Sequence, residues 1–279
     1  MNAQPVFPNP ELEGGYNQRL LVPEHPEIFA RWERESERLR ASNRCTLDVS
    51  YGAHPRQSID IFHAADAHAT LTFIHGGYWR SLDKRMFSFV AEPFLAHGIS
   101  VALIGYRLCP EVHLGGVVND CASALDWLIE NAAALELPVH SHALAGHSAG
   151  GHLAVSMLTR IRLPLHRGLC AVASLSGLFE LAPLIECSMN LDLRLDPKTA
   201  AQFSPTLAKP CHAVPLHLET GGAETCAFRS QTGLLSQAWS EAEISTSSVA
   251  DANHFTIVDA FASGQSEAAA FLIEKSKRR

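Results

Sequence analysis

The chain has 279 residues, of which 47% are hydrophobic and 18% are charged, so its apolar side chains suffice for one large core. Its formal net charge of -7, which no basic cluster offsets, disfavours nucleic acid and anionic membrane surfaces as partners. The N-terminus lacks a basic stretch followed by an apolar run, no window is apolar enough to span a membrane, and the seven cysteines show no CxxC spacing. We therefore expect a single cytoplasmic domain over residues 1–279 that is not exported.

The first expected element is a helix over residues 27–40, followed by two segments, LDVSYG at 47–52 and SIDIFHA at 58–64, in which apolar and polar residues alternate. This alternation is typical of half-buried strands and predicts an opening hairpin. From residue 70 onward, short apolar runs alternate with stretches of helical spacing, which indicates a parallel sheet covered on both faces. The expected strands are 70–74, 100–106, 143–146, 169–175, 214–219 and 244–248, and the expected helices are 84–97, 117–131, 150–161, 225–239 and 256–275.

These patterns predict the α/β class, with a mostly parallel central sheet flanked by helices on both faces. Residues 178–210 interrupt the alternation, and we expect them to form a small cap over the C-terminal edge of the sheet. Residues 1–45 form an N-terminal segment that is a candidate cover for an active site at that edge.

The segment GHSAG at 146–150 has the pattern GxSxG, directly after the expected strand HALAG and directly before the helical segment GGHLAVSMLTR. A sharp strand-to-helix turn needs small flanking residues, here Gly146, Ala149 and Gly150, because the central serine adopts strained backbone angles. The turn also places the Ser148 hydroxyl at the positive end of the following helix dipole. We predict that Ser148 is a nucleophile; the alternative is a glycine-rich turn that only connects two elements or cradles a phosphate.

The segment HGGYW at 75–79 follows the apolar run LTFI. Glycines after such a strand allow backbone N–H groups to approach a substrate oxygen closely. We expect the amides of Gly76 and Gly77 to form an oxyanion hole together with the amide of Ala149, each donor contributing about 2.7 to 4 kcal/mol of transition-state stabilisation.

The side chains of the same segment have less specific roles. Tyr78 and Trp79 are candidates for lining the substrate pocket, but aromatic residues after a core strand are as often packing residues. His75 is expected to support the loop by hydrogen bonding and not to transfer protons, because the base follows the nucleophile in chains with this kind of turn.

A serine hydroxyl needs a histidine to accept its proton. His254, in DANHFTIVDAF, is the candidate, because it lies between the last expected strand and the last expected helix. His140 and His142 form an HxH pattern, but no third ligand lies nearby in the sequence, so we expect a surface loop there and no metal site.

The acid that orients the histidine should follow the strand that ends near Glu219. Glu224 is the candidate, because it lies on a turn opened by two glycines that leads into a helix. Glu219 is still on the strand, and Asp251 would have to fold back within the loop of His254. The alternative for Glu224 is an acid that only stabilises the helix dipole.

With these residues placed, the chain resembles the kynurenine formamidase (arylformamidase) group of α/β-hydrolases, within the esterase and lipase superfamily. The most specific segments are HGGYW at 75–79 and GHSAGGHLA at 146–154. The supporting segments are LDVSYGAHPRQSIDIF at 47–62, SGLFELAPL at 176–184, GGAETCAFRSQ at 221–231 and NHF at 253–255.

The resemblance implies the α/β-hydrolase fold, a catalytic triad of Ser148, Glu224 and His254, and hydrolysis of N-formyl-kynurenine to formate and kynurenine without a cofactor. Many formamidases have aspartate at the acid position, so Glu224 leaves room for another substrate. Arg80 and Arg194 are the candidates for contacting the amino-acid end of kynurenine.

Two other functions are compatible with the sequence. A carboxylesterase for short acyl or aryl esters would have the same catalytic residues, and a catalytically silent relative that binds a small molecule would have a broken triad. The expected partner in each case is a small molecule. Apolar residues in the cap could belong to a homodimer interface or to a substrate entrance.

Overall fold

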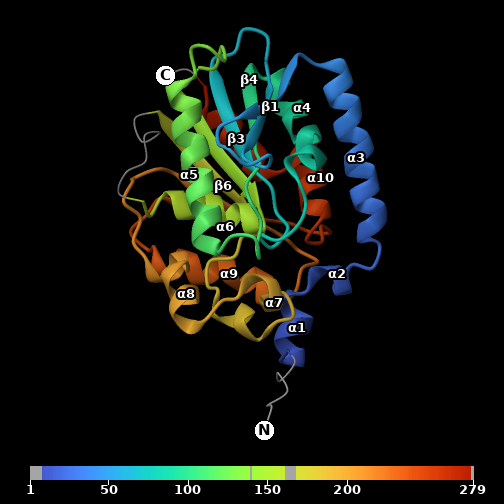
Figure 1. Cartoon of the computed structure of the whole chain (residues 1–279), viewed down its shortest axis with the longest axis vertical. Helices are drawn as coiled ribbons and strands as arrows, with labels where there is room; N and C mark the ends of the chain where they lie inside the picture. The colour runs from blue at the N-terminus through green and yellow to red at the C-terminus, as the bar shows by residue number, and fades with distance from the viewer. Residues whose placement is uncertain (1–7, 139, 161–167, 278–279) are drawn as a thin grey trace.

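The computed structural model describes residues 8–138, 140–160 and 168–277 (Figure 1). Within them an eight-stranded sheet has the order β1-β2-β4-β3-β5-β6-β7-β8. The strands are β1 (Cys45–Ser50), β2 (Ser58–Phe62), β3 (Ala69–Ile74), β4 (Ile99–Ile104), β5 (His142–His147), β6 (Leu169–Leu175), β7 (Leu216–Gly221) and β8 (Ile244–Val249). Strands β3 to β8 run parallel, whereas β2 pairs antiparallel with both β1 and β4. The predicted hairpin, the six predicted parallel strands and the α/β class are confirmed.

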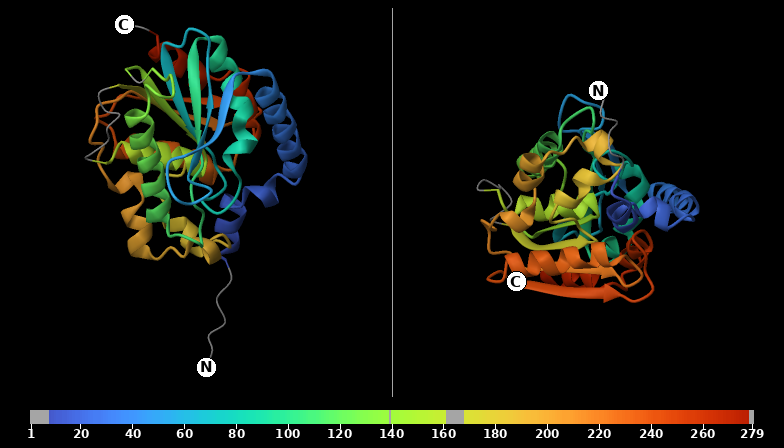
Figure 2. Two further views of the ribbon diagram at one scale, coloured as in Figure 1. Left: turned by 45° about the horizontal axis from the view of Figure 1, so that its top comes forward. Right: turned by 90° about the horizontal axis from the view of Figure 1, so that it is seen from below.

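Helices cover both faces of this sheet, as Figures 1 and 2 show. One face packs against α3 (His25–Ser42), η1 (Lys84–Ala91), α4 (Glu92–Ala96), α10 (Thr256–Ala262) and α11 (Glu267–Lys275). The other packs against α5 (Leu114–Glu130), α6 (Ala149–Met157) and α9 (Cys226–Ala238). Every residue of β2, β3, β4, β5 and β7 is buried. The half-buried strand expected from the alternation at 58–64 is therefore wrong for β2, whose Asp60 is buried and paired with Lys84 at 2.6 Å. Burial on both faces explains why β4 is apolar without alternation.

Two predicted helices are wrong in part. Residues 84–97 form a 3₁₀ helix, η1, and then α4, because Pro93 cannot continue the ladder of a helix that began before it. Residues 256–275 form two helices, α10 and α11. Gly264 has a φ of 71° between them, and the Ser266 side chain accepts a hydrogen bond from the amide of Ala269 at the start of α11. The predicted helix at 150–161 corresponds to α6, and its last residue lies outside the described residues.

Residues 178–210 form short elements at the end of the molecule where α1 (Pro10–Tyr16) lies (Figure 1). These elements are η3 (Ala182–Glu186), α7 (Asn190–Leu193), α8 (Pro197–Gln202) and η4 (Pro205–Leu207). Glu13 of α1 binds this segment, because its carboxylate accepts hydrogen bonds from the amide and hydroxyl of Ser188, at 2.8 and 2.6 Å. The N-terminal segment and residues 178–210 are therefore packed together, and α2 (Gln18–Leu21) follows directly.

Gln231 of α9 joins these parts. Its side chain is fully buried, and its oxygen accepts hydrogen bonds from the amides of Phe179 and Glu180, at 2.7 and 2.8 Å. Its nitrogen donates to the hydroxyl of Tyr16, at 3.0 Å. One amide side chain therefore holds α9, residues 178–210 and the N-terminal segment together.

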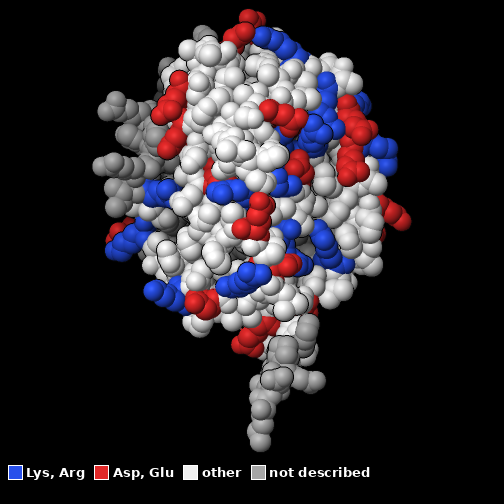
Figure 3. All heavy atoms as spheres, in the orientation of Figure 1, with Lys and Arg blue, Asp and Glu red and all other residues white. Residues whose placement is uncertain are grey.

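The surface of the face in Figure 3 has acidic and basic side chains interspersed. All seven cysteines are free thiols. Among the described residues, every helix is too short or too polar to traverse a bilayer.

Candidate active site

The turn between β5 and α6 holds Ser148 in a strained conformation, with φ 56° and ψ -118°. The Ser148 amide donates to the carbonyl of Leu175 at 2.8 Å, which fixes the turn against β6. A Cβ atom on Gly146 would lie 2.2 Å from the Gly150 oxygen, and one on Gly150 would lie 2.0 Å from the Ile74 oxygen. The motif therefore needs both glycines, since no larger residue fits.

Ser148, His254 and Glu224 form one hydrogen-bonded series. The Ser148 Oγ lies 2.9 Å from His254 Nε2, and His254 Nδ1 lies 2.7 Å from Glu224 Oε1. All three residues are buried, and the Glu224 side chain has no exposed surface. This is the order of contacts that lets a histidine accept the serine proton while a carboxylate fixes the ring and its tautomer.

The loops that hold Glu224 and His254 are bonded to each other. The Gly222 amide donates to Val249 at 2.7 Å, and the Ala223 amide donates to Ala252 at 3.0 Å. A Cβ atom on Gly221 would lie 2.3 Å from the Ala252 oxygen, so the two backbones approach too closely for a side chain. The two glycines that opened the predicted acid turn therefore set the distance between acid and histidine. Asp251, the rival acid, is exposed.

The amides predicted to bind an oxyanion lie beside the serine. A Cβ atom on Gly76 would be 3.2 Å from the Cβ of Ser148, while Gly77 has a φ of 111° that favours glycine. Within the described residues, the N–H groups of Gly76, Gly77 and Ala149 have no recorded acceptor. These three donors are therefore available to a substrate oxygen.

Two further histidines support the site without carrying charge. His75 Nδ1 lies 2.8 Å from the Gly76 carbonyl, to which only an N–H can donate, and burial lowers the pKa of His75 to about 4. The hydrogen bond predicted for His75 within this loop is confirmed. His147 Nε2 lies 2.7 Å from the carbonyl of His254, and burial followed by the charge of His254 places the pKa of His147 well below its usual range.

Sequence reasoning missed His147, because it stands at a variable position of the GxSxG pattern. Its neutral ring holds the main chain of His254 without adding a second positive charge when His254 is protonated. The one signal in the sequence was that a polar residue, His147, directly precedes the predicted nucleophile Ser148.

Tyr78 and Trp79 lie in different places. Tyr78 lines the cavity at Ser148, and its hydroxyl donates to the carbonyl of Tyr16. Trp79 is fully buried in the core, with its ring perpendicular to that of His152 at a centroid distance of 4.9 Å. Trp79 is therefore a packing residue of the core, whereas Tyr78 lines the cavity as one of the two alternatives predicted.

The cavity at Ser148 has a volume of about 40 Å³. Its wall includes His254, Tyr78, Met189 from residues 178–210 and Asn17, Gln18 and Arg19 from the N-terminal segment. A volume near that of one water molecule accepts a small acyl group but not an aromatic ring. An aryl leaving group must therefore extend out of this volume, toward the mouth of the cavity.

Other predicted candidates lie elsewhere. His142 is buried within β5, where its Nε2 lies 2.8 Å from the Thr72 hydroxyl, so the surface loop expected for it is wrong. Burial lowers the pKa of His142 to about 3. The described residues contain no cluster of His, Cys, Asp and Glu suited to a metal ion. Arg80 lies on the cavity wall, whereas Arg194 is exposed at the end of α7 and does not line it.

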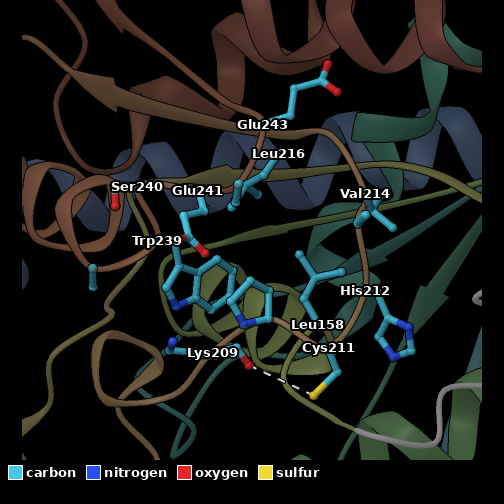
Figure 4. A pocket seen from close by; sticks show the side chains of 14 residues that line it. Leu158, Lys209, Cys211, His212, Val214, Leu216, Trp239, Ser240, Glu241 and Glu243 are labelled. Carbon is cyan, nitrogen blue, oxygen red and sulfur yellow. Dashed lines mark hydrogen bonds between the residues drawn. The ribbon is translucent and has the colours of Figure 1, made fainter.

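A larger cavity, of about 560 Å³, lies near Leu158 and Trp239 (Figure 4). The indole nitrogen of Trp239 donates to the carbonyls of Pro205 and Ala208, at 3.0 and 2.8 Å, and is thereby satisfied. None of the predicted site residues lines this cavity, so size alone does not identify the reactive centre.

The fold and the buried Ser-His-Glu series define the class of the protein, a hydrolase with the α/β-hydrolase fold. Comparisons with known proteins agree. The BD-FAE family matches residues 59–162. Kynurenine formamidase of Danio rerio is 24% identical over 240 residues, covering 80% of this chain and 79% of the relative. Kynurenine formamidase of Drosophila melanogaster is 30% identical over 172 residues, covering 59% and 56%.

Solved structures extend the comparison to more than nine tenths of the chain. A protein of Silicibacter sp. TM1040, for which a thioesterase activity has been suggested, is 31% identical, with a TM-score of 0.85 and coverage of 94% of this chain and 98% of that one. The carboxylesterase EstE1 from a metagenomic library shares the fold, with a TM-score of 0.71, 20% identity and coverage of 91% and 98%. The chain belongs to the kynurenine formamidase-like α/β-hydrolases.

Proposed function

We propose that the chain hydrolyses a small aryl formamide, with N-formyl-kynurenine as the best candidate, through an acyl-enzyme on Ser148. One observation carries the proposal: the continuous series from Ser148 through His254 to Glu224 opens on a cavity with room for an acyl group as small as formyl. The relatives named kynurenine formamidase supply the candidate substrate.

In the first step, His254 Nε2 accepts the proton of Ser148 as the Oγ attacks the formyl carbon. The amides of Gly76, Gly77 and Ala149 stabilise the negative oxygen of the tetrahedral intermediate. When the C–N bond breaks, His254 returns the proton to the leaving nitrogen, and the aromatic amine departs. The formyl group remains as an ester on Ser148.

In the second step, His254 removes a proton from water, which attacks the ester carbon. The C–O bond to Ser148 breaks, the proton returns to the serine oxygen, and formate is released. Glu224 keeps the His254 ring in the tautomer that both steps need. Water is the only co-reactant, so no cofactor is required. The free thiols support a cytoplasmic location.

The test is the measurement of kcat/KM for N-formyl-kynurenine and for p-nitrophenyl acetate, with Ser148→Ala as the control. A formamide value at or above about 10⁴ M⁻¹s⁻¹ would support the proposal, since natural substrates reach this range. A formamide value orders of magnitude below the ester value would contradict it.

A carboxylesterase is the second candidate. It would use the same triad and oxyanion amides, and the named esterases with this fold favour it. Short acyl thioesters belong in the same assay, because a thioesterase has been suggested for the Silicibacter relative. Labelling of Ser148 by a fluorophosphonate probe distinguishes all of these enzymes from a silent binding protein, which would not react.

A further inference from the structure

The wall of the cavity at Ser148 has an unbalanced charge. Two arginines, Arg19 and Arg80, line it, and none of the wall residues is an aspartate or glutamate. A formyl group is uncharged and its oxygen is expected to bind the oxyanion amides, so it needs neither cation. The imbalance therefore concerns the part of a substrate that lies at the mouth of the cavity.

Arg80 is already neutralised. Its guanidinium forms an ion pair with the carboxylate of Asp192 on α7, and both side chains are partly exposed. Glu13, the other acid near Arg80, is bonded to Ser188 and Asn17. Neither carboxylate pairs with Arg19.

Arg19 has only neutral partners among the described residues. One guanidinium nitrogen donates to the hydroxyl of Ser81 at 3.0 Å, and the guanidinium carbon lies 5.8 Å from the ring centre of Phe29. A guanidinium has five N–H donors, so an edge with two parallel donors is left for an incoming carboxylate. Arg19 is exposed, so this edge can be reached from solvent.

Arg19 also lies beside the predicted oxyanion loop, on the same cavity wall as Gly77 and Ser81. Its partner Ser81 closes the turn after the oxyanion glycine, because the amide and the hydroxyl of Ser81 both donate to the Gly77 carbonyl at 3.0 Å. A group attached to the reacting carbonyl would pass between this loop and the N-terminal segment. We propose that Arg19 is a specificity-determining residue that binds a carboxylate on the leaving group of the substrate, an inference that rests on the proposed function.

The test uses two formamides that differ only in the carboxylate, N-formyl-kynurenine and N-formyl-kynuramine. The wild type should prefer the carboxylate by roughly 10-fold in kcat/KM, the value of one charge-assisted bidentate pair at an exposed site. In Arg19→Gln the ratio of the two constants should fall toward one, through KM for N-formyl-kynurenine. Arg19→Lys should keep part of the ratio, because it keeps the charge without the planar fork.

Arg38→Gln is the matched control. Arg38 lies on α3, where it pairs with Glu92 at 2.6 Å and does not line the cavity, so the ratio should stay at the wild-type value. Equal losses for both formamides in Arg19→Gln would overturn the inference, because they would show that Arg19 only positions the loop at Ser81. An unchanged ratio would overturn it as well.

Failure of the proposed function gives a different result. If the wild type cleaves neither formamide but cleaves phenyl acetate, the pair phenyl acetate and 3-acetoxybenzoate replaces the formamides. If the wild type prefers 3-acetoxybenzoate and Arg19→Gln loses this preference, Arg19 binds the carboxylate of an ester substrate in place of a formamide. Equal rates for the two esters in the wild type would overturn the inference.

Discussion

Replacing Glu224 with glutamine tests the proposed triad most directly. The Glu224 side chain has no exposed surface, its Oε1 is 2.7 Å from His254 Nδ1, and its Oε2 has no recorded partner within the described chain. A glutamine oxygen at the first position would leave a buried NH₂ unsatisfied at the second. The flipped amide would point NH₂ at Nδ1 and stabilise the tautomer that cannot accept the serine proton.

Both arrangements of the amide lower the rate. We expect kcat for p-nitrophenyl acetate to fall roughly 10⁴-fold, about 5 kcal/mol of activation free energy, as with a wrong tautomer in other serine hydrolases. The matched variant is Asp251→Asn, which alters an exposed acid three residues before the histidine and should keep the wild-type rate. Thermal melting of both variants checks that they are folded. Near-wild-type turnover in Glu224→Gln, together with inactivity in Asp251→Asn, would refute the assignment of the acid.

Gly150→Ala should lower the free energy of unfolding by about 3 kcal/mol and abolish activity, because its Cβ would lie 2.0 Å from the Ile74 oxygen. Gly233 lies in α9, where an added Cβ atom would meet no other atom within 4 Å. Gly233→Ala should therefore raise the free energy of unfolding by about 1 kcal/mol, as measured by urea unfolding. Equal effects of the two substitutions would contradict the packing argument. Stability should also fall as the pH drops from about 6.5 to 4, because buried neutral histidines resist protonation in the folded state while the unfolded chain takes up protons. The histidines with pKa values of about 4, 3 and 4 are His75, His142 and His152. Urea unfolding at pH 7 and pH 5 measures this loss, which should be about 2 kcal/mol for each histidine, and a flat profile would contradict the burial argument.

The sequence predicted the sheet well because parallel strands covered on both faces need continuous apolar runs, as β3 and β4 show. It failed at residues 256–275, since α10 and α11 bury apolar residues on the same side of the sheet and the pattern continues through Gly264. The proposed triad was predictable because each member follows a strand whose position fixes its place at one edge of the sheet.

Arg19 was not predictable in the same way. Its place at the cavity depends on contacts of the N-terminal segment with residues far along the chain, such as Ser81 and Ser188, and no local pattern encodes these contacts. The different places of Tyr78 and Trp79 were not predictable either. The two aromatic residues are adjacent in one loop, yet Trp79 is buried in the core and Tyr78 lines the cavity.

The buried amide of Gln231 couples the two segments that contribute to the wall of the cavity at Ser148. Because it bonds Phe179, Glu180 and Tyr16 at once, neither the N-terminal segment nor residues 178–210 can move far without leaving the others with unmet polar groups. The helix α9 therefore holds both segments through one side chain that does not itself line the cavity. Any change of the cavity wall that required these segments to shift would act on both of them at once.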